Sequence, residues 1–315
     1  MKDEIAVRLL WTLGFIFVIA AAGLAVSFAT RGRSAAQSRM GTRFGLEVVF
    51  LAAIFVPTYL GGAWVLALAV VLGCLCAAEL YGTFEFGGDT PWKLSGILLG
   101  LGSLFWAYAH PGEIGRVFPV VLALYWVLRF AARGSRTSPL GRARRTTFGV
   151  LYPFLCLACF VDLGVREAGF GYVVLYYGLA EINDSAAYLI GSSIGRHKIF
   201  PRLSPNKTAE GVAGGVLTTI AMAFALWFAV PHFGGLRVAV AGVIIAVAGL
   251  AGDLFASRLK RRVGVKDYGD RVPTQGGVLD VYDAFIFVSP VFWYFVEWTG
   301  GPVEWTGGPV AWTGG

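Results

Sequence analysis

The sequence predicts an all-α, polytopic integral membrane protein with about ten transmembrane helices. Hydrophobic residues make up 57% of the 315-residue chain and charged residues only 14%, whereas a soluble domain averages about 25% charged residues. The apolar runs are about 17 to 25 residues long, which is the length that crosses the hydrocarbon core of a bilayer. Lysine and arginine, which give the chain a net charge of +7, gather in patches between these runs. This composition excludes a soluble globular domain.

The apolar runs give the candidate spans in chain order. The first run follows a mixed-charge Met-Lys-Asp-Glu start and exceeds the apolar core of a signal peptide, so we expect a true membrane helix there. A Leu60-Gly61-Gly62 break separates the second run from the third. The expected spans are residues 7–30, 45–60, 62–81, 94–110, 116–132, 147–163, 170–194, 211–230, 236–256 and 278–298.

The basic patches fix the expected topology. They lie at residues 31–43, 129–145, 196–207 and 258–271. Because basic loops face the cytoplasm, all of these patches should share one side of the membrane. They do so when the chain starts outside and alternates through every expected span. We therefore expect the N-terminus outside and these basic loops on the cytoplasmic side.

The chain divides into three expected parts. Residues 1–145 form an N-terminal hydrophobic multi-span region, and residues 146–298 form a C-terminal catalytic membrane domain. Residues 299–315 are a low-complexity Trp-Thr-Gly-Gly-Pro tail. Glycine and proline break helices, so we expect this tail to lie outside the fold.

Polar residues inside apolar runs are costly and therefore mark candidate functional positions. In the run at 170–194, Glu181, Asp184 and Tyr188 are spaced three and four residues apart and should share one helix face. Two carboxylates in such a run need a metal ion or a cation as a partner. A structural ion pair with another helix is the alternative.

The segment Ser-Pro-Asn-Lys-Thr at residues 204–208 comes directly before an expected helix. Backbone N–H groups at a helix start, together with Lys207, are suited to binding an anion. An ordinary helix N-cap is the alternative for the Ser-Pro pair.

The stretch from Ser257 to Asp283 combines a cationic loop, a Gly-Gly turn and two carboxylates at helical spacing. Cations that hold phosphates, beside carboxylates that hold a metal ion, are suited to phosphoryl or nucleotidyl transfer. Its place at the membrane edge indicates a lipid phosphate as one reactant. Asp280 and Asp283 could instead be charges favoured by the helix dipole. With Asp253 and Asp184 on the same membrane face, a shared metal site is the better interpretation.

The spacing of these residues carries a family resemblance. The downstream block contains Ser257, Lys260-Arg261, Lys266-Asp267, Pro273, Gly276-Gly277, Asp280 and Asp283. The upstream block contains Asp184, Ala187-Tyr188, Gly191, Gly195 and residues 204–208 followed by Glu210-Gly211. Together they resemble the signatures of the phosphatidate cytidylyltransferase (CDP-diacylglycerol synthase) family of integral membrane enzymes. The N-terminal half matches only as a hydrophobic multi-span region.

Several positions depart from the family pattern. Gln275 stands where the pattern has His, and Val281 where it has Arg. Ala284 replaces a common Ser, and Ala256 a frequent Glu. Gln275 can hydrogen-bond a phosphate or ribose but cannot carry a proton at neutral pH. A paralogue with a changed lipid substrate fits these departures.

The resemblance implies an enzyme, a nucleotidyltransferase that transfers a cytidylyl group from CTP to phosphatidate, giving CDP-diacylglycerol and pyrophosphate for phospholipid synthesis. The implied cofactor is Mg²⁺, with a second, monovalent cation left open. The expected partners are CTP, phosphatidate and membrane lipids, with no nucleic acid. The resemblance suggests a homodimer and the bacterial inner membrane, with the active site facing the cytoplasm.

The resemblance also assigns roles to residues. The implied catalytic residues are Asp253, Asp280, Lys260 and Lys207. The implied metal ligands are Asp184, Asp253, Asp280 and Asp283. The implied substrate-binding residues are Ser204, Asn206, Lys207, Thr208, Ser257, Lys260, Arg261, Lys266, Gln275, Gly276 and Gly277.

Two rival functions remain open on the sequence. The first is a related membrane CTP-dependent lipid transferase or kinase, of the CDP-archaeol synthase or polyprenol kinase type. The second is a non-catalytic paralogue that binds or transports lipids, because carboxylates within the membrane also suit a transporter. A panel of lipid acceptors with CTP separates the first rival, and absence of Mg²⁺-dependent CTP binding would favour the second.

Overall fold

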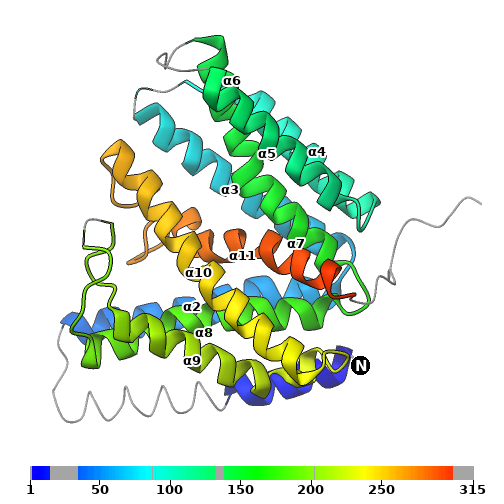
Figure 1. Cartoon of the computed structure of the whole chain (residues 1–315), viewed down its shortest axis with the longest axis vertical. Helices are drawn as coiled ribbons and strands as arrows, with labels where there is room; N and C mark the ends of the chain where they lie inside the picture. The colour runs from blue at the N-terminus through cyan, green and yellow to red at the C-terminus, as the bar shows by residue number, and fades with distance from the viewer. Residues whose placement is uncertain are drawn as a thin grey trace, which may run out of the picture.

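The computed structural model describes residues 2–14, 35–86, 88, 90–131, 138–201 and 203–300, and of residues 35–44 it describes the backbone only. Residues 15–30 of the first expected span and residues 301–315 of the tail lie outside the described residues. Helices carry the architecture of the described part, as Figure 1 shows, so the all-α prediction is confirmed. A further helix covers residues 2–14.

The helices follow the expected spans closely. In chain order they are α2 (Ala35–Leu60), α3 (Ala63–Phe86), α4 (Lys93–Ala109), α5 (Ile114–Ala131), α6 (Pro139–Gly149), a π-helical segment (Val150–Leu155), α7 (Cys156–Gly164), α8 (Gly169–Ile194), α9 (Ala209–Ala225), a 3₁₀ turn (Trp227–Ala229), α10 (Gly235–Val263) and α11 (Val278–Trp298). The break between α2 and α3 is confirmed. Gly61 and Gly62 both adopt positive φ there, at 75° and 51°, a conformation that glycine adopts without steric cost.

Five described helical segments are long and apolar enough to cross a membrane: Ala63–Phe86, Ile114–Ala131, Pro139–Gly164, Gly235–Val263 and Val278–Trp298. Shorter apolar helices at Gly45–Leu60, Lys93–Ala109 and Ala209–Ala225 accompany them. The chain is therefore a polytopic integral membrane protein. The number of helices that cross the bilayer stays a prediction.

The end of α10 corrects one expectation. The basic residues after position 256 were expected in a loop, but α10 continues to Val263 and carries Lys260, Arg261 and Arg262 in its last turn. Cations are favoured at a helix C-terminus because they face its unsatisfied carbonyl groups. Gly264, with a φ of 84°, then ends the helix in the left-handed conformation.

Helix α11 lies in the middle of the bundle, in contact with α7, α8 and α10 (Figure 1). Every residue of α7 is buried. The ring of Tyr176 on α8 stacks on Phe285 and Phe292 of α11, with centroids 5.5 and 5.3 Å apart. Buried aromatic pairs of this kind contribute about 0.5–1.5 kcal/mol each beyond their burial, so they fix α11 against α8.

A buried ionic network holds the C-terminal end of α11. Arg166, in the turn between α7 and α8, pairs with Asp162 of α7 and lies 2.5 Å from the carboxylate of Glu297 on α11. The other oxygen of Asp162 accepts the backbone N–H of Gly112 at 2.5 Å. The N-terminal end of α11 faces the candidate site.

Candidate functional site

A cavity of about 250 Å³ lies among α8, α9, α10 and α11 and is closed on one side by α2. Its polar lining is unusually rich in carboxylates. The ionisable residues that line it are Glu47, Glu181, Asp184, Lys207, Asp253, Lys260, Asp267, Asp280 and Asp283. The structure thus brings the two sequence blocks together, as the predicted topology requires.

A second cavity of about 410 Å³ adjoins the first and shares Asp184 and Lys207 with it. It is lined mainly by hydroxyl, amide and amine groups, which suit an anion. These lining residues are Tyr188, Ser192, Lys198, Ser204, Asn206 and Thr208. The expected anion-binding segment at 204–208 therefore lies beside the carboxylates of the first cavity, and its Lys207 lines both cavities.

Two lysines each pair with one carboxylate in the first cavity. Lys207 Nζ lies 2.5 Å from Asp253 Oδ2, and Lys260 Nζ lies 2.6 Å from Asp280 Oδ1. The side chains of Lys260 and Asp280 are only 12% and 4% exposed. Because buried charges are stable only when paired, each lysine balances an aspartate that would otherwise stay uncompensated.

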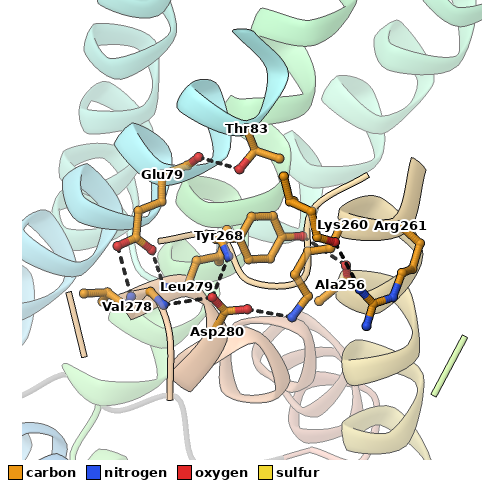
Figure 2. Close-up of polar contacts among 11 residues, drawn as sticks. Glu79, Thr83, Ala256, Lys260, Arg261, Tyr268, Val278, Leu279 and Asp280 are labelled. Carbon is orange, nitrogen blue, oxygen red and sulfur yellow. Dashed lines mark hydrogen bonds and ion pairs between the residues drawn. The ribbon is translucent and has the colours of Figure 1, made fainter. Parts of the chain in front are cut away.

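Asp280 also organises the loop that precedes α11, as Figure 2 shows. Its Oδ2 accepts the backbone N–H of Tyr268 at 2.6 Å and that of Gly277 at 2.8 Å. The Tyr268 hydroxyl donates to the carbonyl of Ala256 at 3.2 Å. Burial, with the carboxylates of Asp283 and Asp280 adding to it, raises the pKa of Tyr268, so this hydroxyl keeps the proton that it donates. Asp280 therefore connects the loop, α10 and α11.

The Gly276-Gly277 turn shows why glycine is needed at these positions. Gly276 has a φ of 102°. A Cβ at Gly277 would lie 2.4 Å from a Glu79 carboxylate oxygen. The Gly276 N–H donates to Val272 O at 3.0 Å and the Gly277 N–H to Asp280. In this structure both groups bond within the loop, so their approach to a phosphate stays a prediction.

The segment before α9 is held by its own hydrogen bonds. Thr208 is the N-cap of α9 and accepts the Gly211 N–H at 3.1 Å, so its hydroxyl acts first as a helix cap. The Glu210 carboxylate accepts the Arg196 and His197 backbone N–H groups at 3.1 and 3.2 Å and contacts His197 Nδ1 at 2.6 Å. Its own backbone N–H and the His197 side chain lower the pKa of Glu210 to about 2. The 195–208 loop is thus anchored on the first turn of α9.

The remaining predicted residues are divided between the cavity wall and the surface. Gln275 lines the first cavity and donates to Glu47 Oε1 at 3.4 Å. Arg261 and Lys266 are exposed and Ser257 is half-buried. Arg261, Lys266 and Ser257 are not among the described residues that line the two cavities. Their predicted contacts with substrate require ligand groups that extend beyond the cavities.

Sequence reasoning missed two carboxylates of the N-terminal region. Glu47 of α2 lines the first cavity, and Glu79 of α3 contacts Arg271 in the loop that carries Gln275 and the first residues of α11. Each is a single acidic residue in an apolar run, which is itself a signal of function because it is costly in a membrane. The signal does not say which helix the carboxylate faces.

The donor set of the first cavity fits a hard divalent cation. Carboxylate oxygens are the protein ligands that Mg²⁺ prefers, and Asp184, Asp253, Asp280 and Asp283 all line this cavity. Within the described part of the chain, however, no group of three such side chains lies close enough together to hold a metal ion. Two of the aspartates face lysines instead, so a shared metal site stays a prediction.

Comparisons with known proteins point to one family. A model of the cytidylyltransferase family matches residues 41–299. The phosphatidate cytidylyltransferase of Bacillus subtilis (strain 168) is 31% identical over 213 residues, which cover 63% of this chain and 77% of that protein. The phosphatidate cytidylyltransferase of Aquifex aeolicus (strain VF5) is 35% identical over 180 residues, 56% of this chain and 64% of that protein.

A protein without an assigned activity is also similar. The uncharacterized protein YnbB of Escherichia coli (strain K12) is 41% identical over 126 residues. That alignment covers 40% of this chain and 42% of YnbB. The matches to these relatives thus span from two fifths to three quarters of the relatives' own lengths.

Proposed function

The chain belongs to the cytidylyltransferase family, and from that premise we propose that it transfers a cytidylyl group from CTP to phosphatidate. The products would be CDP-diacylglycerol and pyrophosphate. One observation supports the proposal in addition to the family match. A carboxylate-rich cavity and a cavity suited to an anion adjoin and share Lys207 and Asp184. A reaction between two phosphate-bearing substrates needs both kinds of surface in one place.

The chemistry requires little acid–base help from the protein. A phosphatidate oxygen attacks the α-phosphorus of CTP, a new P–O bond forms, and the bond to the bridging oxygen of the β-phosphate breaks. The electron pair leaves with pyrophosphate, so atoms and charge balance without a covalent enzyme intermediate. The site therefore acts mainly by positioning the two substrates and by balancing charge.

The lysines supply this balance. Lys207 and Lys260 now neutralise Asp253 and Asp280. An arriving phosphate competes for the same ammonium groups, and each aspartate released in this way becomes available as an oxygen ligand. Lys207, which borders both cavities, can contact phosphates of either substrate.

Asp253 and Asp280 would hold Mg²⁺, with Asp184 and Asp283 as further ligands or as their hydrogen-bonding neighbours. When bound, Mg²⁺ supplies charge neutralisation at the transferring phosphate. We also place the site on the cytoplasmic face of the bacterial inner membrane, because Lys198, Lys207 and Lys260 line the two cavities and basic segments face the cytoplasm. A second, monovalent cation and a homodimer stay predictions.

Purified protein in detergent tests the proposal. Labelled CTP and phosphatidate should give a labelled CDP-lipid in the presence of Mg²⁺, and Asp280→Ala should abolish turnover while the protein stays folded. Gln275 and Val281 depart from the family pattern, which fits a changed lipid acceptor. A parallel panel with a diether lipid phosphate and a polyprenol tests for such a change. Transfer to neither phosphatidate nor another lipid phosphate would refute the proposal.

A further inference from the structure

Glu79 is a buried carboxylate in the N-terminal half of the chain. It lies on α3 and its side chain is only 2% exposed. Figure 2 shows it extending from α3 to the first residues of α11, which are almost two hundred residues later in the chain. A buried acidic side chain is costly unless hydrogen bonds and a counter-charge compensate it, so its contacts need an explanation.

Those contacts use both carboxylate oxygens. Oε2 accepts the backbone N–H of Leu279 at 2.8 Å, and Oε1 accepts that of Val278 at 3.1 Å. Oε1 also accepts from the Arg271 guanidinium at 2.7 Å. Val278 and Leu279 begin α11, so their N–H groups are donors that no helical carbonyl can satisfy. Glu79 therefore caps α11 from a different helix.

This cap acts on the same turn as Asp280. Asp280 receives the N–H groups of Gly277 and Tyr268, while Glu79 receives those of the next two residues. The two carboxylates together fix the start of α11 and the loop before it. That loop carries Gln275 into the first cavity, and the same turn sets the direction of Asp280 toward Lys260.

The geometry requires a carboxylate and not only a side chain of that size. Glutamine is isosteric with glutamate but replaces one acceptor oxygen by an NH₂ donor. Whichever way the amide turned, its NH₂ group would face a backbone N–H of α11. Arg271 would also lose its counter-charge. Packing would be preserved while the cap would be broken.

We propose that Glu79 is a positioning residue of the site: it caps α11 and holds the 267–277 loop, so that Asp280 and Gln275 face the cavity. It acts through these residues and does not line the cavity itself. The activity part of this proposal rests on the proposed cytidylyl transfer, whereas the capping part does not. The N-terminal region thereby contributes to the chemistry of the C-terminal motifs.

Glu79→Gln in the full chain, purified in detergent, tests the proposal with Glu85→Gln as the matched control. Glu85 lies on the same helix but is half-exposed and pairs with Lys93 at 2.6 Å. Hydrogen exchange of peptides spanning residues 268–282 measures the cap directly. We expect exchange at residues 278 and 279 to be about tenfold faster in Glu79→Gln and unchanged in Glu85→Gln, because loss of a hydrogen-bond acceptor exposes these N–H groups locally.

Turnover supplies the second readout. We expect kcat to fall about ten- to a hundredfold in Glu79→Gln, as is typical when residues that orient ligand groups are changed, and the Mg²⁺ concentration for half-maximal activity to rise. Unchanged exchange together with wild-type kcat would overturn the proposal. If the wild-type protein shows no transfer, the proposed function fails and the exchange result alone decides the role of Glu79.

A second variant covers failure of the first to fold. Arg271→Gln removes the counter-charge from the exposed loop and leaves both backbone contacts in place. We expect an intermediate rise in exchange at residues 278 and 279. Exchange identical to that of wild type would show that Glu79 does not depend on its ion pair and would count against the proposal.

Discussion

Replacing Lys260 by methionine separates charge from packing at the centre of the site. Methionine is close in length to lysine, so the change removes the ammonium and keeps most of the side-chain volume. The ammonium lies 2.6 Å from Asp280 Oδ1 and 5.2 Å from the centre of the Tyr268 ring. Without it, the Asp280 carboxylate, which is 4% exposed, loses the ammonium group that pairs with it.

The size of the effect follows from these contacts. Breaking a buried ion pair by removing one partner costs about 3–5 kcal/mol, because the other charge stays buried. Asp280 keeps two backbone N–H donors, so we expect the lower end of that range for stability. If Lys260 also contacts a phosphate in the transition state, loss of that charged hydrogen bond removes about 1.5–3 kcal/mol. At 1.36 kcal/mol per factor of ten, this is a roughly ten- to 150-fold fall in kcat/KM.

The assay is cytidylyl transfer from labelled CTP to phosphatidate, with folded protein quantified by size-exclusion chromatography and thermal denaturation. Arg262→Met is the control, because Arg262 lies in the same last turn of α10 but is exposed and is not among the described residues that line the two cavities. We expect the control to stay within about twofold of wild type, as for surface changes in general. Folded Lys260→Met protein with wild-type kcat/KM would refute the assignment of Lys260 to the site.

Three further predictions concern the same site and the loop before α11. Gly277→Ala places a Cβ 2.4 Å from a Glu79 oxygen and should lower the free energy of unfolding by about 1–3 kcal/mol. Gly102→Ala is the control, because its Cβ meets nothing within 4 Å. Equal melting temperatures for the two variants would contradict this prediction. Lys207→Met and Asp253→Asn should each reduce transfer. The double variant should lose less activity than the product of the two single losses, since paired residues are coupled by about 0.5–3 kcal/mol. Strictly multiplicative losses would mean that their 2.5 Å contact is not functional. Chelation with EDTA should stop turnover and added Mg²⁺ should restore it, and transfer that continues in EDTA would remove the metal from the mechanism.

The sequence predicted the all-α class and the convergence of the two motif blocks because both follow from long-range periodicity and charge. Asp184 and Asp253 are far apart in the chain, yet the predicted alternation of spans puts them on one membrane face, and in the structure they line one cavity. The end of α10 was placed too early because hydropathy falls at its last turns. Hydropathy does not register that cations stabilise a helix C-terminus.

Contacts between individual side chains could not be predicted in the same way. The hydroxyl of Thr208 caps α9, a role that was not predicted for it, and its contact with substrate stays a prediction. Glu79 and Glu47 were not identified, since spacing along one helix does not tell which neighbouring helix a lone carboxylate faces. That information lies in the packing of α2 and α3 against α11.

Together with the contacts at its start, the Arg166 network holds α11 in place along its axis. At one end the helix is tied by Glu79 and Asp280, and at the other by Arg166 through Glu297. A displacement of α11 along its axis would break charged contacts at both of its ends at once. The helix is therefore held at both ends, so Asp280 and Asp283 near its start keep fixed positions in the site.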